Sequence, residues 1–124
     1  MQLRAKRAEA PTYVDSIRTA EKAYHAEWDG FTTVAACPPF VPGPLGVDWD
    51  STWPCYQGFS NLGWLPDGLA LCQYQVVANN DPNSSAMDDF LVTSSCDIDG
   101  DGSYSTYEAN RATKATMTSL NNQY

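Results

Sequence analysis

Four cysteines restrict the fold of this chain more than any other feature of its sequence. They form an even set, Cys37, Cys55, Cys72 and Cys96, without a Cys-x-x-Cys pair. With a single histidine in the chain, this leaves few ways to build a zinc, haem or iron–sulfur site. Two disulfides are therefore expected rather than four reduced thiols, which indicates an oxidising compartment. Four cysteines allow three pairings, and their spacing alone does not choose among them.

The register of a predicted hairpin favours one pairing. Residues 69–78 and 90–96 alternate between apolar and polar side chains, and residues 79–89 are rich in Asn, Asp, Pro and Ser, which are typical of turns. A hairpin centred on position 84 places Cys72 opposite Cys96 and gathers most of the apolar side chains on one face. This predicts the disulfides Cys72–Cys96 and Cys37–Cys55.

The first part of the chain, residues 2–28, is expected to be a helix that packs on a sheet. Pro11 either kinks this helix or lies in the first turn of a segment that starts near Ala10. Gly30 marks its expected end, since glycine commonly follows the last helical residue. A mostly apolar stripe recurs at steps of three and four, the period of one helix face, and comprises Leu3, Arg7, Ala10, Val14, Ile17, Ala20, Tyr24 and Trp28.

The second part, residues 29–68, is expected to be a long irregular connection between helix and sheet, here called the αβ-loop. Six of the eight prolines fall between Pro38 and Pro66, and loops of this length are often functional surfaces. Trp49, Trp53 and Tyr56 are therefore candidates for a partner surface. The alternative, which is the more frequent arrangement, is that the aromatic rings of the loop pack on one another as a small core.

The third part, residues 69–124, contains an acidic segment with the spacing of a calcium-binding loop. Three aspartates occupy positions 1, 3 and 5 of a twelve-residue pattern, and Gly102 occupies position 6, where such loops turn sharply. The alternative is an Asp/Gly-rich turn without an ion. No helix–loop–helix pair is expected, because a strand precedes the segment. The candidate Ca²⁺ ligands are Asp97, Asp99, Asp101, Ser103, Ser105 and Glu108.

The charge balance disfavours several classes of function. Seven Lys and Arg residues stand against 15 Asp and Glu residues, so the net charge is −8. Nucleic acids and anionic membrane surfaces both require an excess of Lys and Arg. No reaction-specific motif is present, so an enzyme is not expected. The longest uncharged run, residues 31–47, is interrupted by four prolines and is not expected to cross a bilayer as a helix.

The order of these three parts resembles the globular part of a type IV pilin or pseudopilin. LRAKRAEAPTYVDSIRTAEKAYHAE resembles the pilin helix just beyond its membrane segment. FSNLGWLPDGLALCQYQV, with Leu62-Gly63-Trp64 and Pro66, resembles the turn into the first sheet strand of deltaproteobacterial-type pilins. FLVTSSCDIDGDGSYSTY resembles the second strand and the Asp-rich turn of the same group. The pilin leader, its cleavage site and the apolar half of the helix are missing, so a truncated soluble domain of a longer parent is expected.

This resemblance implies an α+β, pilin-like fold, with the helix packed on an antiparallel sheet of three or four strands and a calcium turn that is structural. It implies a subunit of a pilus or of a type II secretion filament, whether a major pilin, a minor pilin or a pseudopilin. The parent would be anchored in the inner membrane through the missing helix and be extracellular after assembly, with other pilin subunits as partners. The chain by itself is expected to be monomeric. The alternative is a secreted glycan- or protein-binding module that uses the tryptophan-rich loop.

Overall fold

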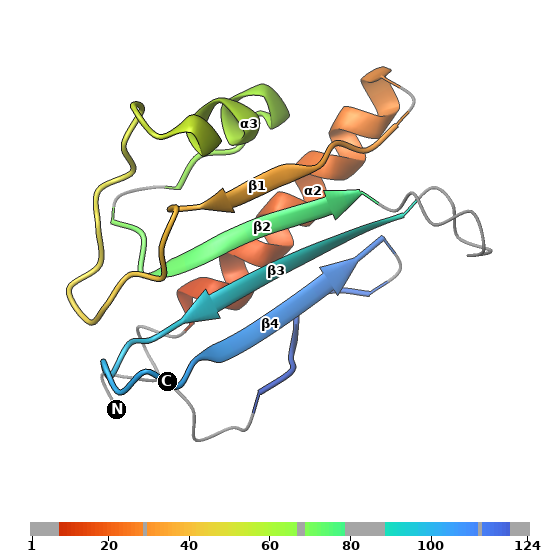
Figure 1. Ribbon diagram of the computed structural model, residues 1–124. Coiled ribbons are helices and arrows are strands. Elements are labelled where there is room, and N and C mark those ends of the chain that lie inside the picture. The colour runs from red at the N-terminus through yellow and green to blue at the C-terminus, as the bar shows by residue number, and fades with distance from the viewer. Residues whose placement is uncertain (1–7, 29, 67–68, 79–88, 112, 120–124) are drawn as a thin grey trace.

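One long helix lies across one face of a five-stranded sheet in the computed structural model, which describes residues 8–28, 30–66, 69–78, 89–111 and 113–119 (Figure 1). The strand order is β1–β2–β3–β4–β5, and each neighbouring pair is antiparallel. The predicted α+β class with an N-terminal helix is confirmed, but the sheet has five strands where three or four were expected. The elements are α2 (Glu9–Trp28), β1 (Val34–Cys37), α3 (Pro54–Leu62), β2 (Cys72–Ala78), β3 (Phe90–Cys96), β4 (Ser105–Asn110) and β5 (Thr116–Met117).

Helix α2 follows from the apolar stripe of the sequence, and its 20 residues span about 30 Å. Pro11 lies in the first helical turn, where the backbone N–H groups have no partner within the helix, so proline removes no hydrogen bond there. Residues 2–7 of the predicted helix lie outside the described residues. Among the residues that are described, no helix has both the length and the apolarity to cross a lipid bilayer.

The predicted hairpin register is confirmed residue by residue. β2 pairs with β3 so that Cys72 lies opposite Cys96, Val76 opposite Val92 and Ala78 opposite Phe90. Both predicted disulfides, Cys72–Cys96 and Cys37–Cys55, are present. The first links the two central strands and the second links the end of β1 to the start of α3. The predicted connection between the two hairpin strands lies outside the described residues except for Asp89.

The αβ-loop differs from its prediction, because it contains a strand and a helix. β1 adds to the sheet beside β2, and α3 follows after a turn at Asp50, whose carboxylate accepts hydrogen bonds from Thr52. Pro54 is the first residue of α3, and Gly63 follows its last residue in a left-handed conformation with φ 88°. Proline at the start and glycine just past the end are typical helix boundary signals, but here they fall within a segment whose overall composition is typical of a loop.

The core lies between α2 and the inner face of the sheet, with α3 closing one side (Figure 1). Side chains alternate along the central strands, so that every second residue is buried. The fully or almost fully buried apolar residues include Val14, Ile17, Phe59, Tyr74, Val76, Phe90, Val92 and Ile98.

Candidate metal centre

The three predicted aspartates of the calcium-like segment lie together in the turn that joins β3 to β4. One carboxylate oxygen from each of Asp97, Asp99 and Asp101 lies within 4.8 Å of the others. Oxygens that share a calcium ion stand about 2.3–2.6 Å from it, so two of them on opposite sides are about 5 Å apart. The spacing of the three carboxylates therefore suits a single hard cation of this size.

Main-chain N–H groups of the turn orient these carboxylates. The Asp97 carboxylate accepts a hydrogen bond from the Gly102 N–H at 3.2 Å, and the Asp101 carboxylate accepts one from the Ser103 N–H at 2.8 Å. Gly102 has a φ of 83°, a backbone conformation that glycine adopts without strain. Ile98 is 1% exposed and anchors the turn in the core. Main-chain hydrogen bonds within the turn and the burial of Ile98 therefore fix its conformation.

Two of the clustered carboxyl groups have shifted pKa values of opposite sign. Desolvation, with added contributions from the neighbouring Asp101 and Asp97, raises the pKa of Asp99. The Ser103 N–H donates to Asp101 and lowers the pKa of that carboxyl. Close carboxylates repel one another, and a divalent cation between them removes this repulsion.

The last two predicted ligands lie in β4, away from the turn. Ser105 is the first residue of β4 and pairs with Cys96 of β3. It is buried, and its hydroxyl has no hydrogen-bond partner among the described residues. Glu108 lies three residues further along, opposite Thr93 and Thr116. Because strand side chains alternate, these two residues point to opposite faces of the sheet, and Glu108 is not among the clustered acids. The structure therefore brings together Asp97, Asp99 and Asp101 of the predicted ligands, with Ser103 in the same turn.

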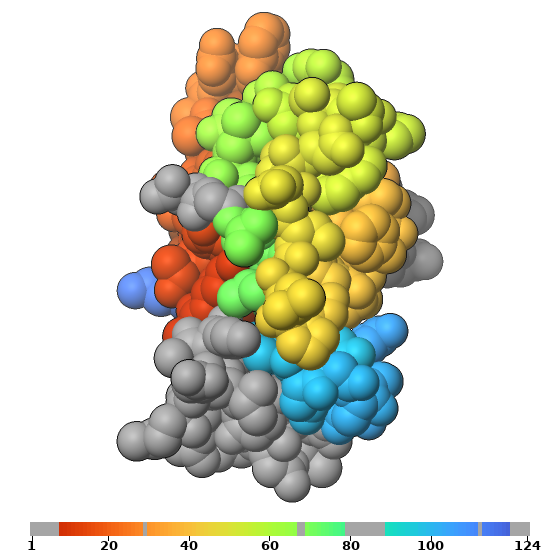
Figure 2. Space-filling view, turned by 90° about the vertical axis from the view of Figure 1, so that its left-hand side faces the viewer, coloured from red at the N-terminus to blue at the C-terminus, as the bar shows by residue number. Residues whose placement is uncertain are grey.

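The tryptophans of the αβ-loop pack edge to face on one another. Trp64 is 7% exposed, while Trp49, Trp53 and Tyr56 are half-buried. The ring of Trp49 lies 5.9 Å from that of Trp53 and 5.8 Å from that of Trp64, both edge to face. In Figure 2 the segment between β1 and α3 covers the middle of the visible face, above the β3–β4 turn. This packing favours the small-core interpretation of the aromatic residues over an open binding platform.

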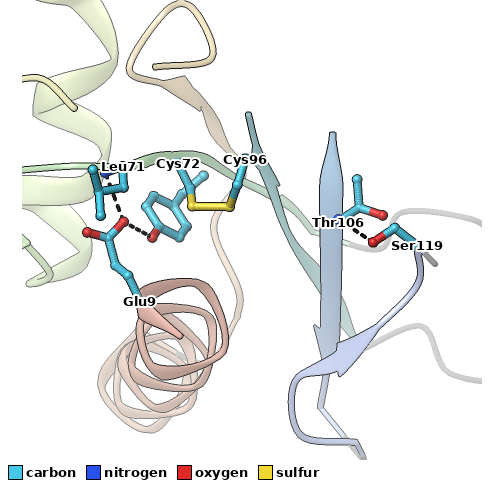
Figure 3. Close-up of a disulfide and its surroundings, with 7 residues drawn as sticks. Glu9, Leu71, Cys72, Cys96, Thr106 and Ser119 are labelled. Carbon is cyan, nitrogen blue, oxygen red and sulfur yellow. Dashed lines mark hydrogen bonds between the residues drawn. A yellow bond between two sulfur atoms is a disulfide. The ribbon is translucent and has the colours of Figure 1, made fainter. Parts of the chain in front are cut away.

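Two glutamates on α2, one half-buried and one buried, were not anticipated from the sequence. Glu9 accepts hydrogen bonds from the Leu71 N–H at 2.9 Å and from the Tyr74 hydroxyl at 2.6 Å, beside the Cys72–Cys96 disulfide (Figure 3). Burial raises the pKa of Glu9 and raises that of Tyr74 well above its usual value. Tyr74 is fully buried, and its hydrogen bond to Glu9 joins β2 to α2.

Glu21 is the buried one of these two glutamates. It is completely buried, and one of its oxygens accepts a hydrogen bond from the Thr32 N–H at 2.9 Å. Its other oxygen has no partner among the described residues, and burial raises the pKa of Glu21 to about 7. The sequence did contain a signal, since Glu21 continues the buried series Ala10, Val14, Ile17 at steps of four, three and four.

Comparison of the chain with protein-family models, with curated proteins and with solved structures finds no match.

Proposed function

We propose that this chain is the globular part of a filament subunit of the type IV pilin or pseudopilin class. The observation that carries the proposal is the position of α2, a 20-residue helix laid across one face of an antiparallel sheet. A disulfide-closed segment connects the helix to the central strands. This arrangement agrees with what the sequence resemblance implies. The function proposed is structural rather than catalytic, in a filament that is extracellular once assembled from inner-membrane-anchored subunits.

The proposal is tested on cells that produce the full-length parent of this chain. Antibodies raised against this chain are expected to label sheared surface filaments along their length in immunogold microscopy, and preincubation with the purified chain should abolish the labelling. The coding sequence upstream of Gln2 should encode a leader followed by about 20 apolar residues, enough for one membrane-spanning helix. An ordinary cleaved signal peptide, with the protein free in the medium, would contradict the proposal and support the secreted binding module.

We also propose that the β3–β4 turn binds Ca²⁺ as a structural ion. The three clustered carboxylates, the turn at Gly102 and the anchoring of Ile98 support this proposal. Ser105 and Glu108 lie in β4 and not in the cluster. The remaining ligands would therefore be carbonyl oxygens of the turn and water. Calcium tolerates such irregular oxygen sets, whereas magnesium requires a tight octahedron.

Calcium is expected to raise the melting temperature of the chain. Binding to the folded state alone stabilises it by about 2.7 kcal/mol when the free ion is at 100 times its dissociation constant. The measurement is a pair of thermal melts, in excess EGTA and in millimolar calcium. Asp99→Asn should remove most of the gain, whereas Asp48→Asn, which changes an exposed carboxylate outside the turn, should retain it. Equal melting temperatures with and without calcium, together with no heat in a calorimetric titration, would show an ordinary Asp/Gly turn.

A further inference from the structure

Two Asp-Gly peptide units follow each other in the turn between β3 and β4. The sequence contains four Asp-Gly pairs, and the two that the structure describes in full are those of this turn, Asp99-Gly100 and Asp101-Gly102. All four residues are exposed, and the turn forms part of the visible surface in Figure 2. An aspartate that precedes glycine is chemically reactive, because glycine has no Cβ atom to shield its main-chain nitrogen.

The reaction is an attack of that nitrogen on the aspartate side chain. In the first pair, the Gly100 nitrogen bonds to the side-chain carbonyl carbon of Asp99, and the hydroxyl of the carboxyl group leaves with the amide proton as water. A second water molecule then opens the five-membered imide ring. When it breaks the bond between the ring nitrogen and the main-chain carbonyl carbon, Gly100 stays attached through the side chain, and Asp99 has become isoaspartate. One water leaves and one returns, so the mass is unchanged and no other reactant is needed.

Hydrogen bonds restrain the second pair at both reacting groups. The Gly102 N–H, whose nitrogen would attack, donates to the two carboxylate oxygens of Asp97 at 3.3 and 3.2 Å. The Asp101 carboxylate, which would be attacked, accepts from the Ser103 N–H at 2.8 Å. Hydrogen bonds to an ionised carboxylate are about twice as strong as those between neutral groups. Reaction at this pair therefore requires two strong hydrogen bonds to break.

The first pair is restrained less. The Gly100 N–H donates to the main-chain carbonyl oxygen of Asp97 at 3.3 Å, which is a neutral acceptor. The Asp99 carboxylate accepts from the Asp101 N–H, also at 3.3 Å, just outside the usual range of about 2.7–3.2 Å. The fold thus holds two neighbouring and chemically alike pairs unequally.

We propose that Asp99 is a modification site, which converts spontaneously to isoaspartate several-fold faster than Asp101 in the folded chain. The change moves one methylene group from the side chain into the main chain, so the turn lengthens and the carboxylate is drawn back. There is little room for a longer turn, since a Cβ atom on Gly100 would lie 3.1 Å from the ring of Pro44. The modified turn is therefore expected to bind calcium more weakly, a consequence that rests on the calcium site proposed above.

The test is prolonged incubation of the purified chain in excess EGTA, at neutral pH and physiological temperature. Proteolysis and electron-transfer mass spectrometry, whose fragments distinguish isoaspartate from aspartate, then give the rate at each position. Isoaspartate is expected to form at Asp99 about five times as fast as at Asp101, which corresponds to one hydrogen bond of about 1 kcal/mol. In concentrated urea the two rates should become similar, because the hydrogen bonds that distinguish the pairs are lost.

Asp99→Glu keeps the charge and should abolish the product at this position, because the longer side chain would have to close a less favourable six-membered ring. Absence of isoaspartate at Asp99 in the wild type, or rates that are equal at the two positions in the folded chain, would overturn the proposal. So would a rate ratio that urea leaves unchanged, since the difference would then come from the local sequence and not from the fold. The rates in EGTA involve neither calcium nor filaments, so their outcome is independent of the function proposed above.

Discussion

Replacing Trp64 with alanine is expected to lower the free energy of unfolding by about 3–5 kcal/mol, as large-to-small changes at buried aromatic residues do. Trp64 is 7% exposed, and its indole N–H donates to the Ser16 hydroxyl at 2.8 Å. Its ring thus joins α2, the end of α3 and β2 in one cluster. The rings that it contacts, with centres 5.2–5.8 Å away, are those of Tyr13, Trp49, Phe59 and Tyr74.

The measurement is urea unfolding followed by circular dichroism. The matched control is Trp28→Ala, which removes the same side chain from the last residue of α2, where it is 65% exposed. That variant should stay within about 0.5 kcal/mol of the wild type, as most surface changes do. Equal losses in the two variants would mean that the aromatic cluster does not connect the helix to the sheet.

A Glu21→Gln variant is expected to become more stable relative to the wild type as the pH rises. Burial raises the pKa of Glu21 from 4.5 to about 7 in the folded chain. Below about pH 4.5 the carboxyl is neutral in both the folded and the unfolded chain, and the wild type has no ionisation penalty. Between the two pKa values the Glu21 carboxyl ionises in the unfolded chain but not in the folded chain. Its contribution to the free energy of unfolding therefore falls by about 3 kcal/mol over this range and does not change further above about pH 7.

The experiment compares urea unfolding of the wild type and the variant at about pH 4 and about pH 8, since the difference between them isolates this residue. Glutamine can still accept the hydrogen bond from the Thr32 N–H and does not titrate. Glu27→Gln changes an exposed carboxyl on the same helix and should show no such trend. A constant difference between the wild type and Glu21→Gln at the two pH values would show that the Glu21 carboxyl is solvated in the folded chain.

The central hairpin could be predicted from the sequence because two independent signals agreed. The alternation of apolar side chains and the spacing of Cys72 and Cys96 both required the same register, which the structure has. A slip by one residue would have turned every buried side chain to the outer face. Helix α2 could also be predicted, since its apolar residues repeat at helical spacing over several turns.

The αβ-loop was harder to predict because its regular elements are short. β1 has four residues and α3 has nine, too few for a periodic pattern to stand out from the surrounding prolines. Pro54 and Gly63 mark the ends of α3, but each is also typical of a loop. β1 depends on its pairing with β2, far along the chain, and the Cys37–Cys55 disulfide joins β1 to α3.

The acidic segment was predicted in part. Asp97, Asp99 and Asp101 converge as expected, because their spacing and the turn at Gly102 are local. The position of Glu108 is decided by pairing with β3 and β5, a long-range effect that a twelve-residue pattern does not contain. The half-buried Glu9 and the buried Glu21 were missed because a charged residue in a helix is ordinarily exposed.

The close approach of α3 to β1 bears on how copies of this chain can associate. A Cβ atom on Gly58 would lie 2.8 Å from a methyl group of Val34, so α3 packs tightly beside the outermost strand. The pairing of β1 with β2 is also irregular between Val34 and Cys37, and at the opposite margin β5 has two residues. Edge strands that are short, irregular or covered hinder the addition of a strand from another molecule. In the proposed filament, copies of this domain are therefore expected to contact one another side by side through their surfaces, and not by extending one continuous sheet.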